Sequence, residues 1–248
     1  MPSVSGKKHE RIQSTRSQST ASGLAGGFRP EHSFLRSRSC AQEADHGARG
    51  ILSGQDGRKD GGHTVKATDE LKKEHRGIEL MLRVLEAVAD RFRRGERVDP
   101  AHLQGILEFL SVFVDKCHHG KEEEFLFPAL EMAGVPREGG PIGVMLSEHE
   151  KGRGLAARLK EAVTGRQPGD APDTAGAQRI IGEYVALLTQ HIAKENMVLF
   201  AMADARLDSN KDAELYEAFE KLERERIGVG KHDEFHALLD RLEAAFLK

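Results

Sequence analysis

Two copies of one residue pair, a histidine followed four residues later by a glutamate, occur in this chain: His119 with Glu123 and His191 with Glu195. Both pairs lie in segments with the period of a helix, where residues i and i+4 stand one turn apart on the same face. Each pair can therefore direct an imidazole and a carboxylate at one point. Both also lie on the apolar stripe of their segment, where a carboxylate is costly unless a positive charge meets it. A metal ion is the simplest such charge.

Two further histidines, His75 and His149, can reach the same level. We expect four helices that run up and down with short connections, because each segment has a helical period and boundary signals, such as Asp99-Pro100 at the start of the second. The expected ranges are about 68–94, 100–133, 141–164 and 175–203. His75 then lies about 19 residues before a turn and His119 about 19 residues after it, which at a constant rise per residue is the same height. His149 and His191 match in the same way, at about 15 and about 16 residues from their turn.

The arrangement His, His-x-x-x-Glu, His, His-x-x-x-Glu resembles the hemerythrin-like HHE cation-binding family. The sequences that follow the two histidines, Glu-Glu-Phe-Leu-Phe from Glu123 and Glu-Asn-Met-Val-Leu-Phe from Glu195, are similar to that family's Glu-x-x-Leu-Phe segments. The resemblance covers about 66–248 and implies a non-haem di-iron site, Fe2+ or Fe3+, bridged by oxo or carboxylate groups. Glu123 and Glu195 would bridge, and the histidines would be terminal ligands. Mixed carboxylate and imidazole donors suit iron, although zinc or manganese accepts them too.

One position departs from the oxygen-carrying members of the family. They place a second histidine four residues before the one on the third helix, and this chain has Met145 there. A thioether is a poor ligand for hard ferric iron, so six protein ligands are expected. That set is similar to the di-iron proteins linked to iron–sulfur cluster repair and nitrosative stress. Those proteins usually carry an N-terminal cysteine-bearing domain, whereas Cys40 here stands alone in a sequence without a core.

Other residues near the site have competing interpretations. His118 and Glu122 form the same pair one residue earlier, and we expect them to be exposed or to support the ligands. Glu79, four residues after His75, is a candidate ligand, but a charge on the helix face is favoured.

Three more positions have a structural interpretation and a functional one. Tyr184 is interpreted as a core tyrosine rather than a radical carrier, and Cys117 as a small buried apolar side chain. His232 and His236 have metal-like spacing, but no carboxylate-bearing helix is obviously paired with them. A packing role is therefore expected for their helix.

Length and charge fit one domain with a helical extension. The apolar period starts near residue 68, and two amphipathic segments at about 211–226 and 231–247 follow the bundle. With 37 basic and 40 acidic residues there is no overall field to recruit nucleic acid or an anionic membrane. Two distant cysteines give no disulfide framework and no apolar run has the length of a membrane span, so a cytoplasmic location is expected.

The segment 1–65 differs in kind from the rest of the chain. It contains ten Gly, ten Ser and ten Lys or Arg against six acidic residues, a composition typical of disorder. The segment is also consistent with a gene start assigned too far upstream, since Val65 opens a stretch that reads like the beginning of a bundle protein.

The sequence thus predicts an all-α, hemerythrin-like bundle with ligands His75, His119, Glu123, His149, His191 and Glu195. We expect it to handle a small ligand, O2, NO or peroxide, with electrons from an unidentified donor in oxidative or nitrosative stress or iron homeostasis. The alternative is a non-catalytic module that stores iron or senses oxygen or iron by ordering on metallation. A third alternative is a bundle whose metal is lost or only occasionally bound.

Overall fold

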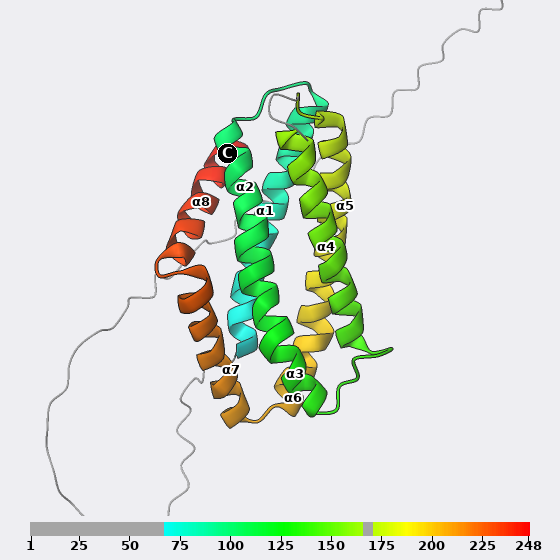
Figure 1. The fold of residues 1–248 in the computed structure, drawn as a ribbon, viewed down its shortest axis with the longest axis vertical. Helices are drawn as coiled ribbons and strands as arrows, with labels where there is room; N and C mark the ends of the chain where they lie inside the picture. Colours follow the sequence, from blue (N-terminus) through cyan, green and yellow to red (C-terminus); the bar gives the residue numbers. More distant parts are fainter. Residues whose placement is uncertain (1–66, 166–170) are drawn as a thin grey trace, which may run out of the picture. The chain divides into compact units, whose positions relative to one another are not determined.

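The computed structural model describes residues 67–165 and 171–248, and these residues form helices and no strands. The expectation of disorder for residues 1–65, and Cys40 with it, lies outside the described residues. Four helices form an up-down-up-down bundle (Figure 1), which confirms the predicted fold class. The helices are α1 (Ala67–Arg93), a second helix over residues 100–132, α4 (Pro141–Thr164) and a fourth helix over residues 174–206.

The second and fourth helices each contain π-helical stretches. The second runs through α2 (Pro100–Glu108), η1 (Phe109–His119), η2 (Glu122–Leu126) and α3 (Phe127–Met132), and the fourth through α5 (Thr174–Lys194), η3 (Glu195–Leu199) and α6 (Phe200–Arg206). In them the Gly120 N–H donates to the backbone carbonyl of Asp115 and the Phe200 N–H donates to the backbone carbonyl of Glu195, each five residues back. Such stretches inside α-helices are frequent at functional sites. Both stand at the level of the His-x-x-x-Glu pairs.

Local chemistry determines where the helices begin. The Asp99 carboxylate accepts a hydrogen bond from the Ala101 N–H at 2.8 Å, and Asp173 does the same for Gly176 at 2.8 Å. Before α4, a Cβ on Gly140 would lie 2.1 Å from the carbonyl oxygen of Pro136, so the turn requires glycine. These starts set the height at which each histidine enters the bundle.

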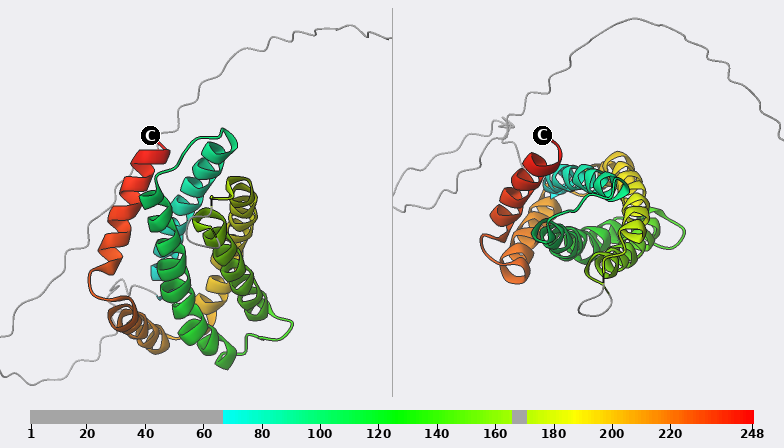
Figure 2. Two further views of the ribbon diagram at one scale, coloured as in Figure 1. Left: turned by 45° about the horizontal axis from the view of Figure 1, so that its top comes forward. Right: turned by 90° about the horizontal axis from the view of Figure 1, so that it is seen from above.

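A C-terminal hairpin covers one side of the bundle. It consists of α7 (Ser209–Leu222), η4 (Glu223–Ile227) and α8 (Lys231–Phe246), and it packs against α1 and the second helix (Figure 2). The Phe235 ring on α8 lies 5.6 Å from the Phe109 ring and 5.7 Å from the Phe113 ring. The hairpin therefore buries an outer face of the second helix that would otherwise be exposed.

The apolar core has two parts, one toward each end of the bundle. One contains Met81, Leu85, Ile181 and Leu188, and the other contains Leu71, Leu126, Leu130 and Phe200. Between them the chain buries a layer of histidines and glutamates. Among the described residues no helix is both long enough and apolar enough to cross a membrane.

Candidate metal centre

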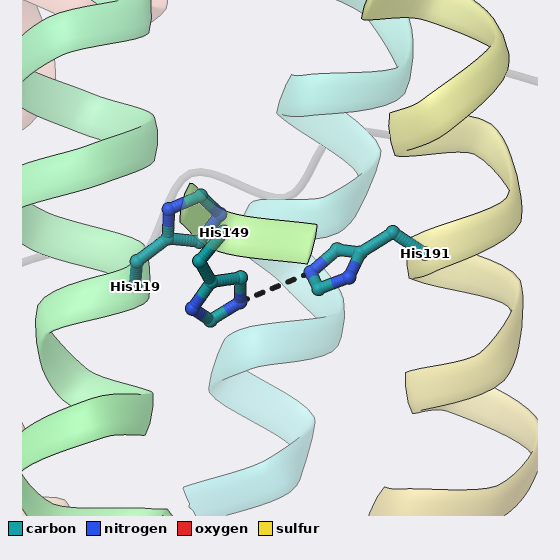
Figure 3. A group of neighbouring side chains, drawn as sticks. All are labelled: His119, His149 and His191. Atoms are coloured by element: carbon teal, nitrogen blue, oxygen red, sulfur yellow. Dashed lines mark hydrogen bonds between the residues drawn. The ribbon is translucent and has the colours of Figure 1, made fainter. Parts of the chain in front are cut away.

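Each of the four helices brings one fully buried histidine into the polar layer. His75 on α1 and His118 on η1 point their Nε2 atoms at each other at 3.0 Å, and His149 on α4 and His191 on α5 do so at 3.2 Å. The four side chains are each at most 2% exposed. The centre thus contains two histidine pairs. Figure 3 shows His149 and His191 converging from their two helices.

Two glutamates lie between the histidine pairs. Glu195 places Oε2 at 3.2 Å from Nε2 of His75 and at 3.3 Å from Nε2 of His191. Glu122 reaches both pairs as well, with Oε1 at 3.7 Å from Nε2 of His118 and Oε2 at 3.4 Å from Nε2 of His149. Both carboxylates are fully buried, and none of their four oxygens has a hydrogen-bond partner among the described residues. Buried carboxylates in this state require a cation.

The other ring nitrogen of each histidine is held by a side chain from a neighbouring helix. Every Nδ1 can therefore carry the hydrogen and donate it, which leaves the Nε2 lone pair directed at the centre. The acceptors follow one another around the bundle: Glu74 on α1 holds His118 at 2.8 Å, Glu123 on the second helix holds His149 at 2.6 Å, Glu148 on α4 holds His191 at 3.1 Å, and Asn196 on η3 holds His75 at 2.9 Å.

Three of these acceptors are carboxylates, and each is paired with a cation. Lys121 donates to Glu74, Arg153 donates to Glu123 at 2.6 Å, and Lys194 donates to Glu148. Burial opposes the charge on Glu74, but Lys121 and His118 outweigh it and lower the Glu74 pKa to about 2. The outer carboxylates are thus charged at neutral pH, and the paired Lys or Arg side chains balance that charge.

Electrostatics at the centre favour positive charge. Burial lowers the pKa of His149, but the carboxylates of Glu122, Glu123 and Glu195 raise it to about 11. Burial likewise opposes ionisation of Glu195, yet the facing histidines hold its pKa well below the usual range. In a protein without metal, protons on imidazoles would compensate the two central glutamates. The donor set, four imidazole nitrogens and two carboxylates, fits divalent or trivalent metal ions.

The expectation that His118 and Glu122 are exposed is wrong, because both are fully buried, and both belong to the groups of side chains that could hold a metal ion. Glu123, expected to bridge, has 26% of its side chain exposed and bonds to His149 and Arg153 instead. The error has a tertiary cause. Phe109 and Phe113 are as apolar as the residues that face the bundle, so the sequence places them on the same stripe as His119, but they pack against α8.

A sequence signal for the correct face does exist. Six residues spaced four apart on the second helix are apolar except for one histidine and one glutamate, and all six are buried. They are Leu110, Val114, His118, Glu122, Leu126 and Leu130. This series passes through His118 and Glu122, one residue before the pair that was chosen.

His119, the other residue of the predicted pair, is also buried but stands beside the centre. Its ring stacks on His149 with centroids 3.8 Å apart (Figure 3), and neither ring nitrogen has a hydrogen-bond partner among the described residues. Nδ1 lies 3.6 Å from Asp115. Burial and then repulsion by His149 lower the pKa of His119 well below its usual value, so the ring is neutral. It groups with His149 and His191 as a third set of potential ligands.

The remaining sequence candidates are not among the central donors. Glu79 is exposed, and Cys117 is buried, with burial raising the pKa of its thiol. The expected packing role of the last helix agrees with the position of His232, whose ring lies 5.4 Å from that of Phe113. Tyr184 is 2% exposed.

Sequence reasoning missed Glu74, Glu148 and Asn196, although a signal was present. Each one directly precedes or follows a residue that had been singled out, namely His75, His149 and Glu195. A residue next to a ligand on a helix points about 100° away from it, toward the neighbouring helix.

The sequence is similar to that of known proteins. The family model described as the Hemerythrin HHE cation binding domain matches residues 66–203, more than half of the chain. An uncharacterized protein of Mycobacterium tuberculosis, Rv1995, is 24% identical over 178 residues, which cover 72% of this chain and 68% of the relative.

Two proteins named iron-sulfur cluster repair protein YtfE match over a shorter stretch. The one from Enterobacter is 34% identical over 104 residues, covering 40% of this chain and 47% of that protein. The one from Escherichia coli is 31% identical over 108 residues, covering 42% and 49%. The alignments thus span about half the length of the YtfE proteins. No solved structure matches the chain.

Proposed function

The chain belongs to the hemerythrin HHE cation-binding domain family, and from this premise we propose that it holds two iron ions in the layer between its four helices. His75 and His118 would hold one ion, His149 and His191 the other, and Glu122 and Glu195 would lie between them. One observation carries the proposal: two fully buried glutamates, with no hydrogen-bond partner among the described residues, face both histidine pairs.

The donors suit iron and argue against a soft metal. Imidazole together with carboxylate suits iron, whereas a soft-metal site would use thiolates, and the nearby Cys117 belongs to a different group of side chains with Glu74 and Glu223. The four Nδ1 bonds keep every imidazole in the tautomer that can bind metal. Zinc and manganese accept the same donors, so metal identity has to be measured.

When bound, two irons supply two one-electron redox steps, which suits a small ligand such as O2, NO or peroxide. The residues of the chain contribute the surroundings. Apolar clusters border the layer on either side, and the outer pairs Glu74–Lys121, Glu123–Arg153 and Glu148–Lys194 hold the imidazoles in place. An electron donor outside the chain would complete a catalytic cycle.

A role in oxidative or nitrosative stress, or in iron homeostasis, is part of the proposal. Its support is the likeness to proteins named for iron-sulfur cluster repair, over about half of their length. A non-catalytic module for iron storage or for sensing is the second candidate, because the central carboxylates have no hydrogen-bond partner among the described residues and a metal that bound them would stabilise the bundle.

Metal content and the visible spectrum test the proposal directly. Protein prepared without affinity tags or chelators is assayed for iron, then its spectrum is recorded before and after dithionite and after peroxide. We expect about two irons per chain and a charge-transfer band that bleaches on reduction and returns on oxidation. Iron below about a tenth of an equivalent after anaerobic loading with ferrous salt would contradict it. Two irons without turnover of peroxide, O2 or NO would favour the storage or sensing role.

A further inference from the structure

A large cleft lies between the second helix and α4. Its volume is about 1290 Å³, and its lining extends from Val98 and Pro100, in and after the α1–α2 connection, down to His119 beside the metal centre. A water molecule takes up roughly 30 Å³ of liquid, so the cleft has room for about forty of them. A diatomic ligand or peroxide needs a small fraction of that volume. Pockets for organic ligands are typically of about 300–1,000 Å³.

The long walls of the cleft are apolar. Leucines and valines of the second helix face small and branched side chains of α4 across it, and the residues that matter here are Leu103, Leu107, Leu110, Val114, Ala156 and Val163. Charged side chains also line it, and their signs nearly balance. They are Arg97, Arg153 and Lys160 against Glu96, Asp99, Glu108 and Asp115. Arg153 is already paired with Asp115 and Glu123. The other five are exposed to solvent, so the interior of the cleft favours an uncharged occupant.

The inner end of the cleft is polar in a specific way. His119 lines it, is 3% exposed and has two ring nitrogens without a hydrogen-bond partner among the described residues. Tyr184 lines it too, and burial with the nearby Asp115 carboxylate raises its pKa, so the phenol stays a donor. A buried imidazole without a partner carries the cost of its lost water contacts unless a ligand satisfies it.

We propose that this cleft binds an uncharged amphipathic organic molecule, with a hydroxyl-type group against His119 and Tyr184 and an apolar chain or ring along the leucines and valines. The His119 ring stacks on His149, so the polar group of the bound molecule would lie one ring away from the metal centre. The inference goes beyond the proposed metal chemistry and does not depend on it.

Calorimetric titration of the full chain tests the proposal, with iron content measured on the same sample. Decan-1-ol is the probe, and decanoate and decylammonium are its charged analogues. We expect saturable binding of decan-1-ol at one site, at least about tenfold tighter than either analogue, because Arg153 and Asp115 neutralise each other and the other charged lining residues are exposed to solvent. No saturable binding, or tighter binding of a charged analogue, would overturn the proposal. If decan-1-ol binds equally well to samples with different iron contents, the cleft proposal stands or fails independently of the proposed iron site.

Three variants locate the site. Ala156→Phe fills the cleft and should weaken decan-1-ol at least about tenfold, whereas Ala186→Phe, the same change at an exposed position of α5 outside the cleft, should leave it unchanged. Tyr184→Phe and His119→Phe retain an aromatic ring but remove the polar atoms. Each should weaken the affinity for decan-1-ol by about 2- to 10-fold, the range for one lost hydrogen bond. If Ala156→Phe does not fold, these two variants decide. Unchanged affinity in them, or in a folded Ala156→Phe, would place the alcohol elsewhere and sink the proposal.

Discussion

Adjacent residues on the second helix have different tasks at the centre. Glu122 has no hydrogen-bond partner among the described residues and faces both histidine pairs, while Glu123 holds Nδ1 of His149 and is paired with Arg153. A central carboxylate would contact metal directly, and an outer one acts through the imidazole that it holds. Their loss should therefore have different consequences.

We expect Glu122→Ala to reduce bound iron to at most about one per chain, because the carboxylate shared by both histidine pairs is gone. Glu123→Ala should keep both irons but weaken their binding by about 10- to 100-fold, the usual effect of removing a group that orients a ligand. Iron per chain and competition with a chelator measure the two effects. Equal loss of iron from both variants would show that the assignment of faces is wrong.

Buried Lys121 offers a second contrast at this scale. It is completely buried between Glu74 and Glu223, whereas Lys194, which serves Glu148 in the same way, has 40% of its side chain exposed. Lys121→Met should lower the free energy of unfolding by about 3–5 kcal/mol, because two carboxylates lose their partner in the interior. Lys194→Met should cost at most about 1 kcal/mol. Urea denaturation of metal-free protein compares them, and similar losses would mean that water reaches Lys121.

At the scale of elements, the C-terminal hairpin is connected to the centre by side chains. His118 donates to Glu74, Lys121 bridges Glu74 to Glu223 on η4, and Glu223 accepts from His232 on α8 at 3.3 Å. The hairpin also buries Phe109 and Phe113. It therefore closes the bundle on the side of His118.

The docking of this hairpin should depend on pH through His232. Its hydrogen bond to Glu223 raises the His232 pKa, against the opposing effect of burial; the charged or titratable groups around it are Glu223, Glu74, Lys121 and His236. A raised folded-state pKa contributes stability below the unfolded value of about 6.5, and the contribution is lost as pH rises through the folded value. The hairpin should thus weaken from about pH 6.5 upward.

His232→Gln should remove this loss, so the drop in unfolding free energy between pH 6 and pH 9 should shrink by about 1 kcal/mol. His236→Gln is the matched control. Burial lowers the His236 pKa, so its contribution has the opposite sign and is lost as pH falls. Urea midpoints at both pH values measure the difference. An unchanged slope in His232→Gln would contradict the role of the Glu223 bond.

For the molecule as a whole, the metal should be part of the fold's stability. The central layer separates two apolar clusters and contains four carboxylate oxygens without a hydrogen-bond partner in the described part of the chain. Free metal at about 100 times the dissociation constant adds about 2.7 kcal/mol per site if only the folded state binds. Thermal unfolding with and without ferrous iron under anaerobic conditions should show a clear rise in the midpoint. In a Glu195→Ala variant, ferrous iron should raise the midpoint much less. An equal rise in the variant and in the unchanged chain would mean that the iron binds elsewhere.

The helix limits and the level of the polar layer follow from residue order alone, because they depend on local chemistry. Asp99-Pro100 and Asp173 start helices, and the expected bounds agree with the observed ones within about three residues. The rise per residue then brings His75, His149, His191 and Glu195 to one height.

The rotation of the second helix depends on packing between distant segments. Residues buried by the hairpin and residues buried by the bundle are equally apolar in the sequence, so the pattern supports two stripes, and the packing of α8 against Phe109 and Phe113 decides which one faces outward. The cyclic order of Glu74, Glu123, Glu148 and Asn196 and the cleft beside His119 also arise only between helices. Neither involves a spacing within one helix, and spacing is all that a periodic pattern reports.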